Sequence, residues 1–299
     1  MSTNESPSPA NPVIEIHARV PDYHPGAPTI YVTDPNDPPW GVPHALMTWV
    51  SSLVLLAVVP LLVVIPYVVY RTWLFGAERP EALLADKNVI FVSLLGVIPT
   101  HFLSFLVVWL VVTNRGRRPF WQNLGWSWPV NFGPWKSITL AVVLLAVGLL
   151  MTLVFPGKET QFDQILSSSY KARLIAAFLA VVTGPLVEEL IYRGVLYSAL
   201  QRAIGMLWAV LIVSLLFAGV HVFQYFNNFG VIAVIGILSV SLTLVRARTG
   251  RLLPSFVMHV VFNGVQALVL ILQPFVEKPG SEQPAAACFL IKSFSRFLG

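Results

Sequence analysis

Residues 172–201 have the sequence ARLIAAFLAVVTGPLVEELIYRGVLYSALQ, and this stretch decides the class of fold. It is largely apolar and longer than the roughly 20 residues that a membrane-spanning helix needs. It nevertheless holds Glu188, Glu189 and Arg193. Each charge at the centre of a bilayer costs about 2.5–3.5 kcal/mol on insertion scales. Charged groups at this depth therefore need partners, and they mark a candidate functional site.

The composition of the whole chain agrees with a membrane protein. Of 299 residues, 56% are hydrophobic and 11% are charged, against roughly 25% charged residues in soluble proteins. We therefore predict an all-α fold, a polytopic transmembrane helical bundle. The single cysteine, Cys288, excludes an internal disulfide. Basic residues flank the apolar runs, where they suit the headgroups of a lipid bilayer, so no nucleic-acid partner is expected.

The apolar runs predict about seven spans, of which the sixth is near the short limit for crossing a bilayer. We expect them at residues 45–74, 88–113, 134–155, 172–201, 206–226, 230–245 and 253–274. Lys and Arg residues are balanced between the two sides of this arrangement, so the positive-inside rule leaves its orientation open.

The spans divide the chain into four parts. Residues 1–44 hold ten of the 23 prolines and are expected to form a disordered polar tail. Residues 45–170 comprise the N-terminal spans and an interfacial loop rich in Trp and Arg. Residues 171–275 form a core that holds the intramembrane charges. Residues 276–299 are a C-terminal tail that could form an interfacial helix.

Helical geometry separates the two glutamates. Residues four apart share a helix face, so Glu189 and Arg193 can form an ion pair. Glu188 lies about 100° away around the helix and is not claimed by that pair. Gly184-Pro185, one turn earlier, predicts a loosened helix just before the glutamates. The pair Glu189–Arg193 is expected to be structural, and Glu188 is left for chemistry.

Two histidines and an asparagine lie in other spans. His221 is in the fifth span, while His259 and Asn263 are four residues apart in the seventh, so the latter two share a face. A single buried histidine usually satisfies a core hydrogen bond, but the combination with Glu188 favours a shared site. One observation opposes it: a count at 1.5 Å per residue separates His221 from His259 by roughly 13 Å along the membrane normal.

Glutamate, histidine and an amide together suggest hydrolysis. A carboxylate can take a proton from water, and a histidine can hold that water in place. A second histidine and an amide can donate hydrogen bonds to the oxyanion of a tetrahedral intermediate. No covalent nucleophile is required.

Three ordered motifs resemble those of a known family. They are Glu188-Glu189-x-x-x-Arg193, Phe217-x-x-x-His221 and His259-x-x-x-Asn263. In combination they are similar to the motifs of the CAAX-processing and bacteriocin-processing (CPBP, or Abi) intramembrane endopeptidases, which include the type II CAAX prenyl endopeptidases. The resemblance covers about residues 172–270, and residues 1–170 carry no motif that we can place.

The resemblance implies an integral, multi-pass protease of the cell (inner) membrane with an active site open to the cytosol. Position by position, it implies that Glu188 and His221 activate water, that His259 and Asn263 bind the oxyanion, and that Glu189 and Arg193 are supporting residues. The implied partner is a membrane-associated protein or peptide substrate, which could be prenylated.

Three alternatives stay open. Two His and a Glu are also a credible zinc set, although the sequence favours a mechanism with no metal and no other cofactor. The same Glu and His groups could serve a proton- or ion-coupled transporter. A catalytically idle immunity or scaffold protein could share the fold.

Overall fold

The computed structural model describes residues 34–276 except 77–78, 80–81, 84, 156–157, 159 and 227. The described residues form helices joined by turns, with no strand among them. Residues 1–33 of the predicted tail and the predicted C-terminal helix, with Cys288, lie outside the described residues.

The helices confirm the predicted all-α transmembrane bundle. Six helical segments of the described chain are long and apolar enough to cross a membrane. These are α1 (Val42–Phe75), α3 (Lys87–Val112), α5 (Pro134–Val154), the interrupted helix Tyr170–Ile204, α11 (Phe229–Thr249) and α12 (Leu253–Val276). A shorter apolar helix, α10 (Met206–Val222), brings the number to seven.

The short helix is not the one that the sequence indicated. We expected the sixth span to be near the limit, but α11 has 21 residues and α10 has 17. The fifth span ends early because the chain turns after Val222, and Asn228 then caps α11 by accepting a hydrogen bond from the Val231 N–H at 3.2 Å. The apolar residues Phe223 and Phe226, which extended the predicted span, belong to this turn.

The helix that carries the glutamates changes its winding twice. It begins as α7 (Tyr170–Phe178), becomes the π-helical stretch η1 (Leu179–Thr183), and continues as α8 (Gly184–Glu188). A second π-helical stretch, η2 (Glu189–Leu196), precedes α9 (Tyr197–Ile204). The irregularity predicted at Gly184-Pro185 is therefore a π-helix directly before α8, a feature that is often found at functional sites.

Two glycines make tight connections between helices. Gly205 has a φ of 82° and separates α9 from α10, and Gly250 has a φ of 65° and ends α11. Only glycine adopts such angles without strain. The short helices α4 (Phe120–Asn123) and α6 (Gln161–Ser168) lie in the longer connections.

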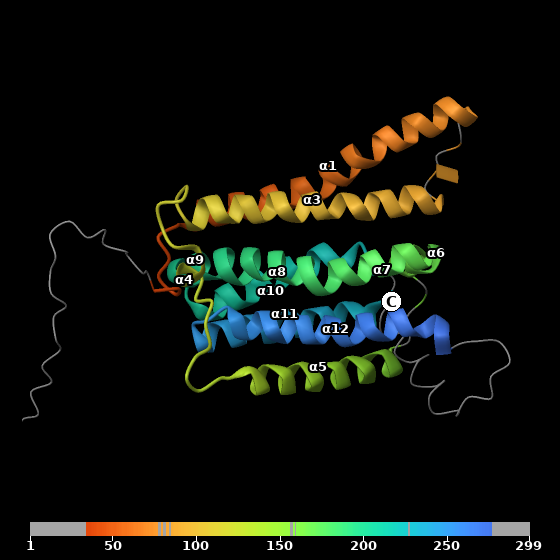
Figure 1. Ribbon diagram of the computed structural model, residues 1–299. Helices are drawn as coiled ribbons and strands as arrows, with labels where there is room; N and C mark the ends of the chain where they lie inside the picture. The colour runs from red at the N-terminus through yellow and green to blue at the C-terminus, as the bar shows by residue number, and fades with distance from the viewer. Residues whose placement is uncertain are drawn as a thin grey trace, which may run out of the picture. The chain divides into compact units, whose positions relative to one another are not determined.

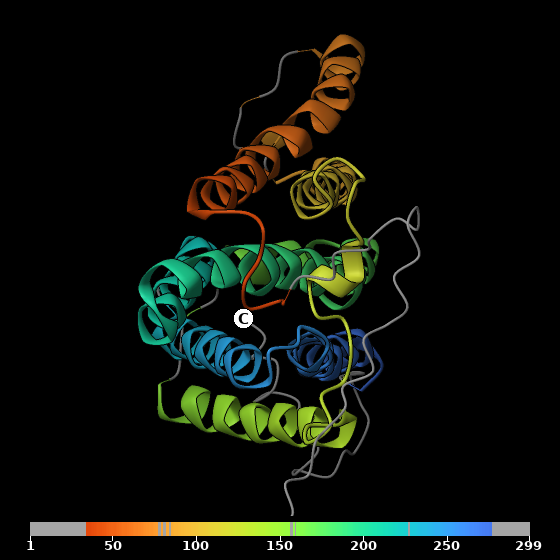
Figure 2. The same ribbon diagram turned by 90° about the vertical axis from the view of Figure 1, so that its left-hand side faces the viewer.

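Figures 1 and 2 show the helices in layers. The pair α1 and α3 lies on one side of the interrupted helix, and α11 and α12 lie on the other, with α5 packed outside them. Helix α10 packs against both α9 and α11. The interrupted helix is thus in the middle of the bundle, and η2 is buried along its whole length.

Residues 34–41 precede α1 and pack against the bundle. Trp40 is buried, and its indole N–H donates to the Val195 carbonyl at 3.1 Å. Arg246 donates to the Pro35 carbonyl at 2.7 Å and to the Asn36 amide oxygen at 2.8 Å. Arg246 is itself fully buried, whereas basic residues that flank an apolar run are expected at the lipid headgroups. These contacts fix the entry into α1.

Candidate active site

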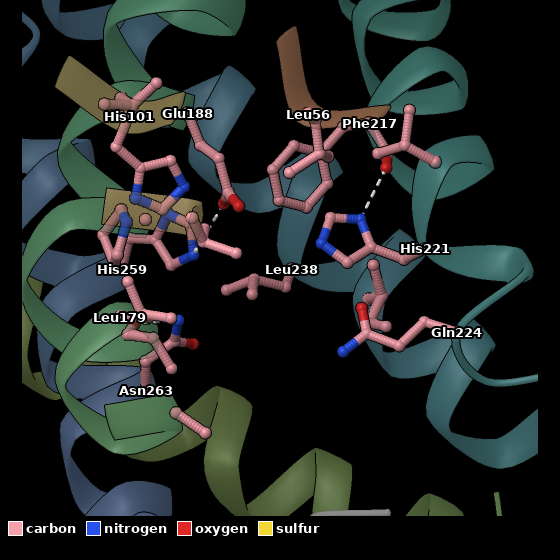
Figure 3. A pocket seen from close by; sticks show the side chains of 18 of the residues that line it. Leu56, His101, Leu179, Glu188, Phe217, His221, Gln224, Leu238, His259 and Asn263 are labelled. Atoms are coloured by element: carbon pink, nitrogen blue, oxygen red, sulfur yellow. Dashed lines mark hydrogen bonds and ion pairs between the residues drawn. The ribbon is translucent and has the colours of Figure 1, made fainter. Parts of the chain in front are cut away.

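A largely apolar cavity of about 420 Å³ lies inside the bundle. Its lining comes from α1, α3, the interrupted helix, α10, α11 and α12. All four residues predicted to be catalytic line it: Glu188, His221, His259 and Asn263. Figure 3 shows them on two facing walls, with Glu188, His259 and Asn263 on one side and His221 on the other. The fold therefore brings them to one cavity without direct contact between His221 and the first wall.

The two glutamates differ in exposure and partners. The Glu189 side chain is 0% exposed, and its Oε1 atom lies 3.2 Å from Arg193 Nη1. The Glu188 side chain is 30% exposed and faces the cavity. The ion pair predicted from the four-residue spacing is thus present, and Glu188 is the carboxylate that a substrate can reach.

Arg193 is held from three sides although it is fully buried. Its Nε donates to Thr243 Oγ1 at 3.2 Å, and its Nη2 donates to Ser239 Oγ at 2.9 Å and to the Ser239 carbonyl at 3.2 Å. The Phe217 ring lies 4.4 Å from the guanidinium carbon, a cation–π contact. A buried charge with this many partners fixes η2 against α10 and α11.

His259 contacts both glutamates. Its Nδ1 is 3.1 Å from Glu189 Oε1, and its Nε2 is 3.7 Å from Glu188 Oε2. A carboxylate only accepts hydrogen bonds, so Nδ1 carries the proton that it shares with Glu189. The sequence did not indicate this link, because spacing along one helix says nothing of contacts between α12 and the interrupted helix.

His221 is held by the first residue of its own motif. Its Nδ1 lies 2.8 Å from the Phe217 carbonyl, and the two rings are 4.8 Å apart between centroids. The carbonyl can only accept, so Nδ1 is protonated and, in the neutral ring, Nε2 presents a lone pair. Phe217 therefore orients His221 and covers Arg193, two functions that only the fold reveals.

Asn263 is anchored to the π-helical stretch η1. Its Nδ2 donates to the Ala180 carbonyl at 2.8 Å. An amide nitrogen carries two hydrogens, so one remains available for a group in the cavity. The irregular backbone before Glu188 thus positions a side chain of α12.

His101 is a polar residue of the cavity that belongs to none of the three motifs. It lies on α3, its Nδ1 is 2.7 Å from Thr183 Oγ1, and its ring is next to the Glu188 carboxylate in Figure 3. By itself, a histidine within an apolar span indicates only a packed or hydrogen-bonded residue. This is the one signal that His101 carries.

The described residues do not fit the zinc alternative. Nowhere among them do three or more His, Cys, Asp or Glu side chains converge in a way that could hold a metal ion. His221 is on the wall opposite Glu188 and His259, so the two histidines do not converge on one point. We therefore derive no catalytic step through a metal.

Together, the fold and the site define a class of protein: an integral, multi-pass helical membrane protein with Glu, His and Asn side chains in a cavity of the helical bundle. Residues 170–265 match the family model "Type II CAAX prenyl endopeptidase Rce1-like". The membrane-embedded CAAX protease MroQ of Staphylococcus aureus (strain USA300) is 24% identical over 254 residues, which cover 79% of this chain and 94% of that protein. No solved structure matches the chain.

The matched residues hold all three motifs, from Glu188 to Asn263. The family model and the relative both support the resemblance to the CPBP/CAAX proteases that the motifs indicated. The family and the relative support a membrane protease. The roles of the individual residues stay predictions.

Proposed function

We propose that the protein is an intramembrane endopeptidase that hydrolyses a peptide bond of a membrane-associated protein or peptide, using water activated by Glu188. One observation carries the proposal: the Glu188 side chain is 30% exposed and faces a cavity that other polar groups also line. The donors His259 and Asn263 are on the same wall, and the acceptor His221 is on the facing wall. A scissile peptide bond would lie between the walls. The relationship to CAAX proteases favours this function over the transporter and idle-scaffold alternatives.

In the first step, the water oxygen attacks the carbonyl carbon and one water proton passes to Glu188. His221 supports the attack, because its unprotonated Nε2 can accept a hydrogen bond from the same water. The Phe217 carbonyl keeps that tautomer in place.

The carbonyl oxygen becomes an oxyanion, which needs donors that are already oriented. The free N–H of Asn263 is one such donor. His259 is the second when its ring is doubly protonated, since Nδ1–H then goes to Glu189 and Nε2–H lies at the cavity wall, 3.7 Å from Glu188 Oε2. Glu189, held by Arg193, stabilises that charge.

In the second step, the carbon–nitrogen bond breaks and Glu188 returns its proton to the leaving amine. The products are a new carboxyl terminus and a new amino terminus. The cycle uses no covalent intermediate and no metal. We accordingly expect chelators to leave cleavage unchanged and metal analysis of the purified protein to find no stoichiometric ion.

The test uses the full chain, purified and placed in proteoliposomes. Its probes are two internally quenched peptides ending in Cys-aliphatic-aliphatic-X, one farnesylated and one not. Wild type should cleave at least one, and E188Q should reduce the rate by about 10³-fold or more because the base is lost. The exposed R248Q variant serves as a charge-changing control. An E188Q enzyme as active as wild type would contradict the proposal.

Natural substrates can be found independently of these peptides. Termini of membrane proteins are compared between cells with wild type and cells with E188Q. New carboxyl termini that disappear only with E188Q identify the substrates, and their chemistry shows whether they are prenylated.

A further inference from the structure

His101 is a conspicuous group of the cavity that the proposed mechanism does not use. It lies on α3, well before the residues that match the family model. Its ring is partly buried and lines the cavity beside Glu188. A second ionisable group on the same wall can influence the orientation of the Glu188 carboxylate.

Thr183 determines which nitrogen of His101 faces inward. The Thr183 hydroxyl is 2.7 Å from Nδ1, so Nε2 is the ring nitrogen left for the cavity. No other hydrogen bond to His101 occurs among the described residues. The hydroxyl can donate or accept, and the choice decides the tautomer of the ring.

The neighbouring charge selects between the two tautomers. His101 and the Glu188 carboxylate are neighbours on the lining of the cavity in Figure 3, with no direct hydrogen bond between them. If Nδ1 carried the proton, the lone pair of Nε2 would face a negatively charged group. If Thr183 donates to Nδ1, Nε2 carries the proton and donates toward Glu188. In the second arrangement the Thr183 hydroxyl has an acceptor, and the Nε2–H is directed at the negative charge instead of a lone pair.

The π-helical stretch η1 anchors two side chains of the cavity wall that holds Glu188. η1 supplies Thr183 to His101 on α3 and the Ala180 carbonyl to Asn263 on α12. Gly184 follows, and a Cβ there would lie 2.8 Å from the Leu179 carbonyl oxygen, so the backbone is tightly packed before Glu188. His101 on α3 would therefore act on the Glu188 carboxylate, whose own backbone is held in place.

We propose that His101 is a positioning residue for Glu188: its Nδ1 is fixed by Thr183, and its Nε2–H attracts the carboxylate and favours the orientation that accepts a proton from water. The inference deepens the proposed function and rests on it. His101 touches neither the water nor the scissile bond in this arrangement. Its effect should fall on the rate of the chemical step and leave substrate binding nearly unchanged.

Two amide variants separate this positioning function from simple packing. An Asn side chain places its amide near the Nδ1 position and can still meet Thr183, whereas a Gln side chain reaches the Nε2 position and can donate to Glu188. The substrate is the quenched peptide that wild type cleaves. H101A should lower kcat for this peptide by about 10–100-fold, as misplacement of a catalytic group does, and should change KM less than two-fold. H101Q should recover most of the lost kcat, and H101N should not.

The opposite pattern would overturn the proposal. If H101N restores activity and H101Q does not, the residue serves Thr183 and the packing of α3. An H101A variant with wild-type kcat would overturn it as well. T183V, which removes the hydroxyl and keeps the shape, should lower kcat less than H101A because only the orientation of the ring is relaxed.

A readout without catalysis keeps the inference separable from the proposed function. Protein labelled with ¹⁵N-histidine in detergent gives ring signals that report the tautomer, and the His101 signals are those missing in H101Q. In E188Q these signals should shift, and in R248Q they should not. If E188Q leaves the His101 signals unchanged, the inferred interaction between His101 and Glu188 is wrong, even if the enzyme cleaves peptides. A wild type that cleaves no peptide overturns the proposed function, and the ring signals then still decide whether the contact exists.

Discussion

Glu188 and Glu189 are adjacent in the sequence but have opposite surroundings. Glu189 is fully buried between Arg193 and His259, while Glu188 opens to the cavity. A buried carboxylate with fixed charged partners is suited to holding helices together. A carboxylate at a cavity wall can exchange protons with water. The same substitution should therefore have different effects at the two positions.

We predict that E189Q destabilises the protein far more than E188Q. Loss of one partner of a buried ion pair leaves the other charge uncompensated and costs about 3–5 kcal/mol. Arg193 keeps its bonds to Ser239 and Thr243, so the loss should be at the lower end of that range. Thermal unfolding in detergent micelles measures it. Equal melting temperatures for the two variants would contradict the division between them.

The site shows what one sequence can and cannot predict at this scale. The pair Glu189–Arg193 followed from a four-residue spacing, because both side chains are on one helix. The links from His259 to both glutamates and from Phe217 to Arg193 join different helices, so spacing carries no information about them. His101 lacked any partner within its own span, and its neighbour Thr183 is brought to it only by the packing of α3 on the interrupted helix.

At the scale of elements, apolar runs predicted where the spans are but not how they are wound. The regular spans α3 and α5 agree with prediction to within one residue at each end. The π-helical stretches η1 and η2 could not be predicted, because an extra residue in a turn is stabilised by tertiary contacts such as Asn263 to Ala180. The turn after α10 was missed because its residues are as apolar as the span.

The start of α3 has a pH-dependent cap. Asp86 accepts hydrogen bonds from the backbone N–H of Asn88 at 2.8 Å and of Val89 at 3.0 Å, and it pairs with Arg71 of α1. Burial raises the pKa of the Asp86 carboxyl, but the hydrogen bonds from Val89, Arg71 and Asn88 outweigh it and hold the pKa below its usual value. The cap is therefore strongest when the carboxyl is ionised.

We predict that D86A destabilises the protein by about 0.5–2 kcal/mol at neutral pH, the usual effect of losing such a cap. A group with a lowered pKa in the folded state contributes stability above its unfolded pKa of about 3.9, and the contribution is lost as the pH falls through the folded value. The difference in melting temperature between wild type and D86A should therefore be constant near pH 7 and shrink below about pH 4. D86N keeps a capping oxygen and should lose less. A difference that grows on acidification would contradict this account.

At the scale of the whole molecule, the cavity depends on parts of the chain that carry no motif. Ser52 and Leu56 of α1, together with His101 of α3, line it beside the motif residues. The family match begins at residue 170, so the motifs gave no reason for the first two spans, α1 and α3. Their packing on the interrupted helix supplies that reason, because it completes the enclosure around Glu188.

The separation of the two walls is also a property of the whole bundle. The residue count separates His221 from His259 along the membrane normal, and the fold sets the two on facing walls of a shared cavity. Space between them is then required, because a peptide bond and a water must fit there. Residues that border this space should be sensitive to size rather than to chemistry.

Leu238 of α11 provides the test, because it is buried and lies between the walls in Figure 3. We predict that L238W lowers kcat/KM at least about ten-fold, since the larger side chain takes the volume that the substrate needs, while L238M, of similar volume, keeps activity. Overpacking can itself cost about 1–3 kcal/mol, so melting temperatures are measured alongside cleavage of the quenched peptide. L56W narrows the same cavity from α1. Leu56 is 47% exposed, so the larger side chain should destabilise the fold less there than at Leu238. Cleavage at the wild-type rate by folded L238W and L56W would show that substrate does not enter between the walls.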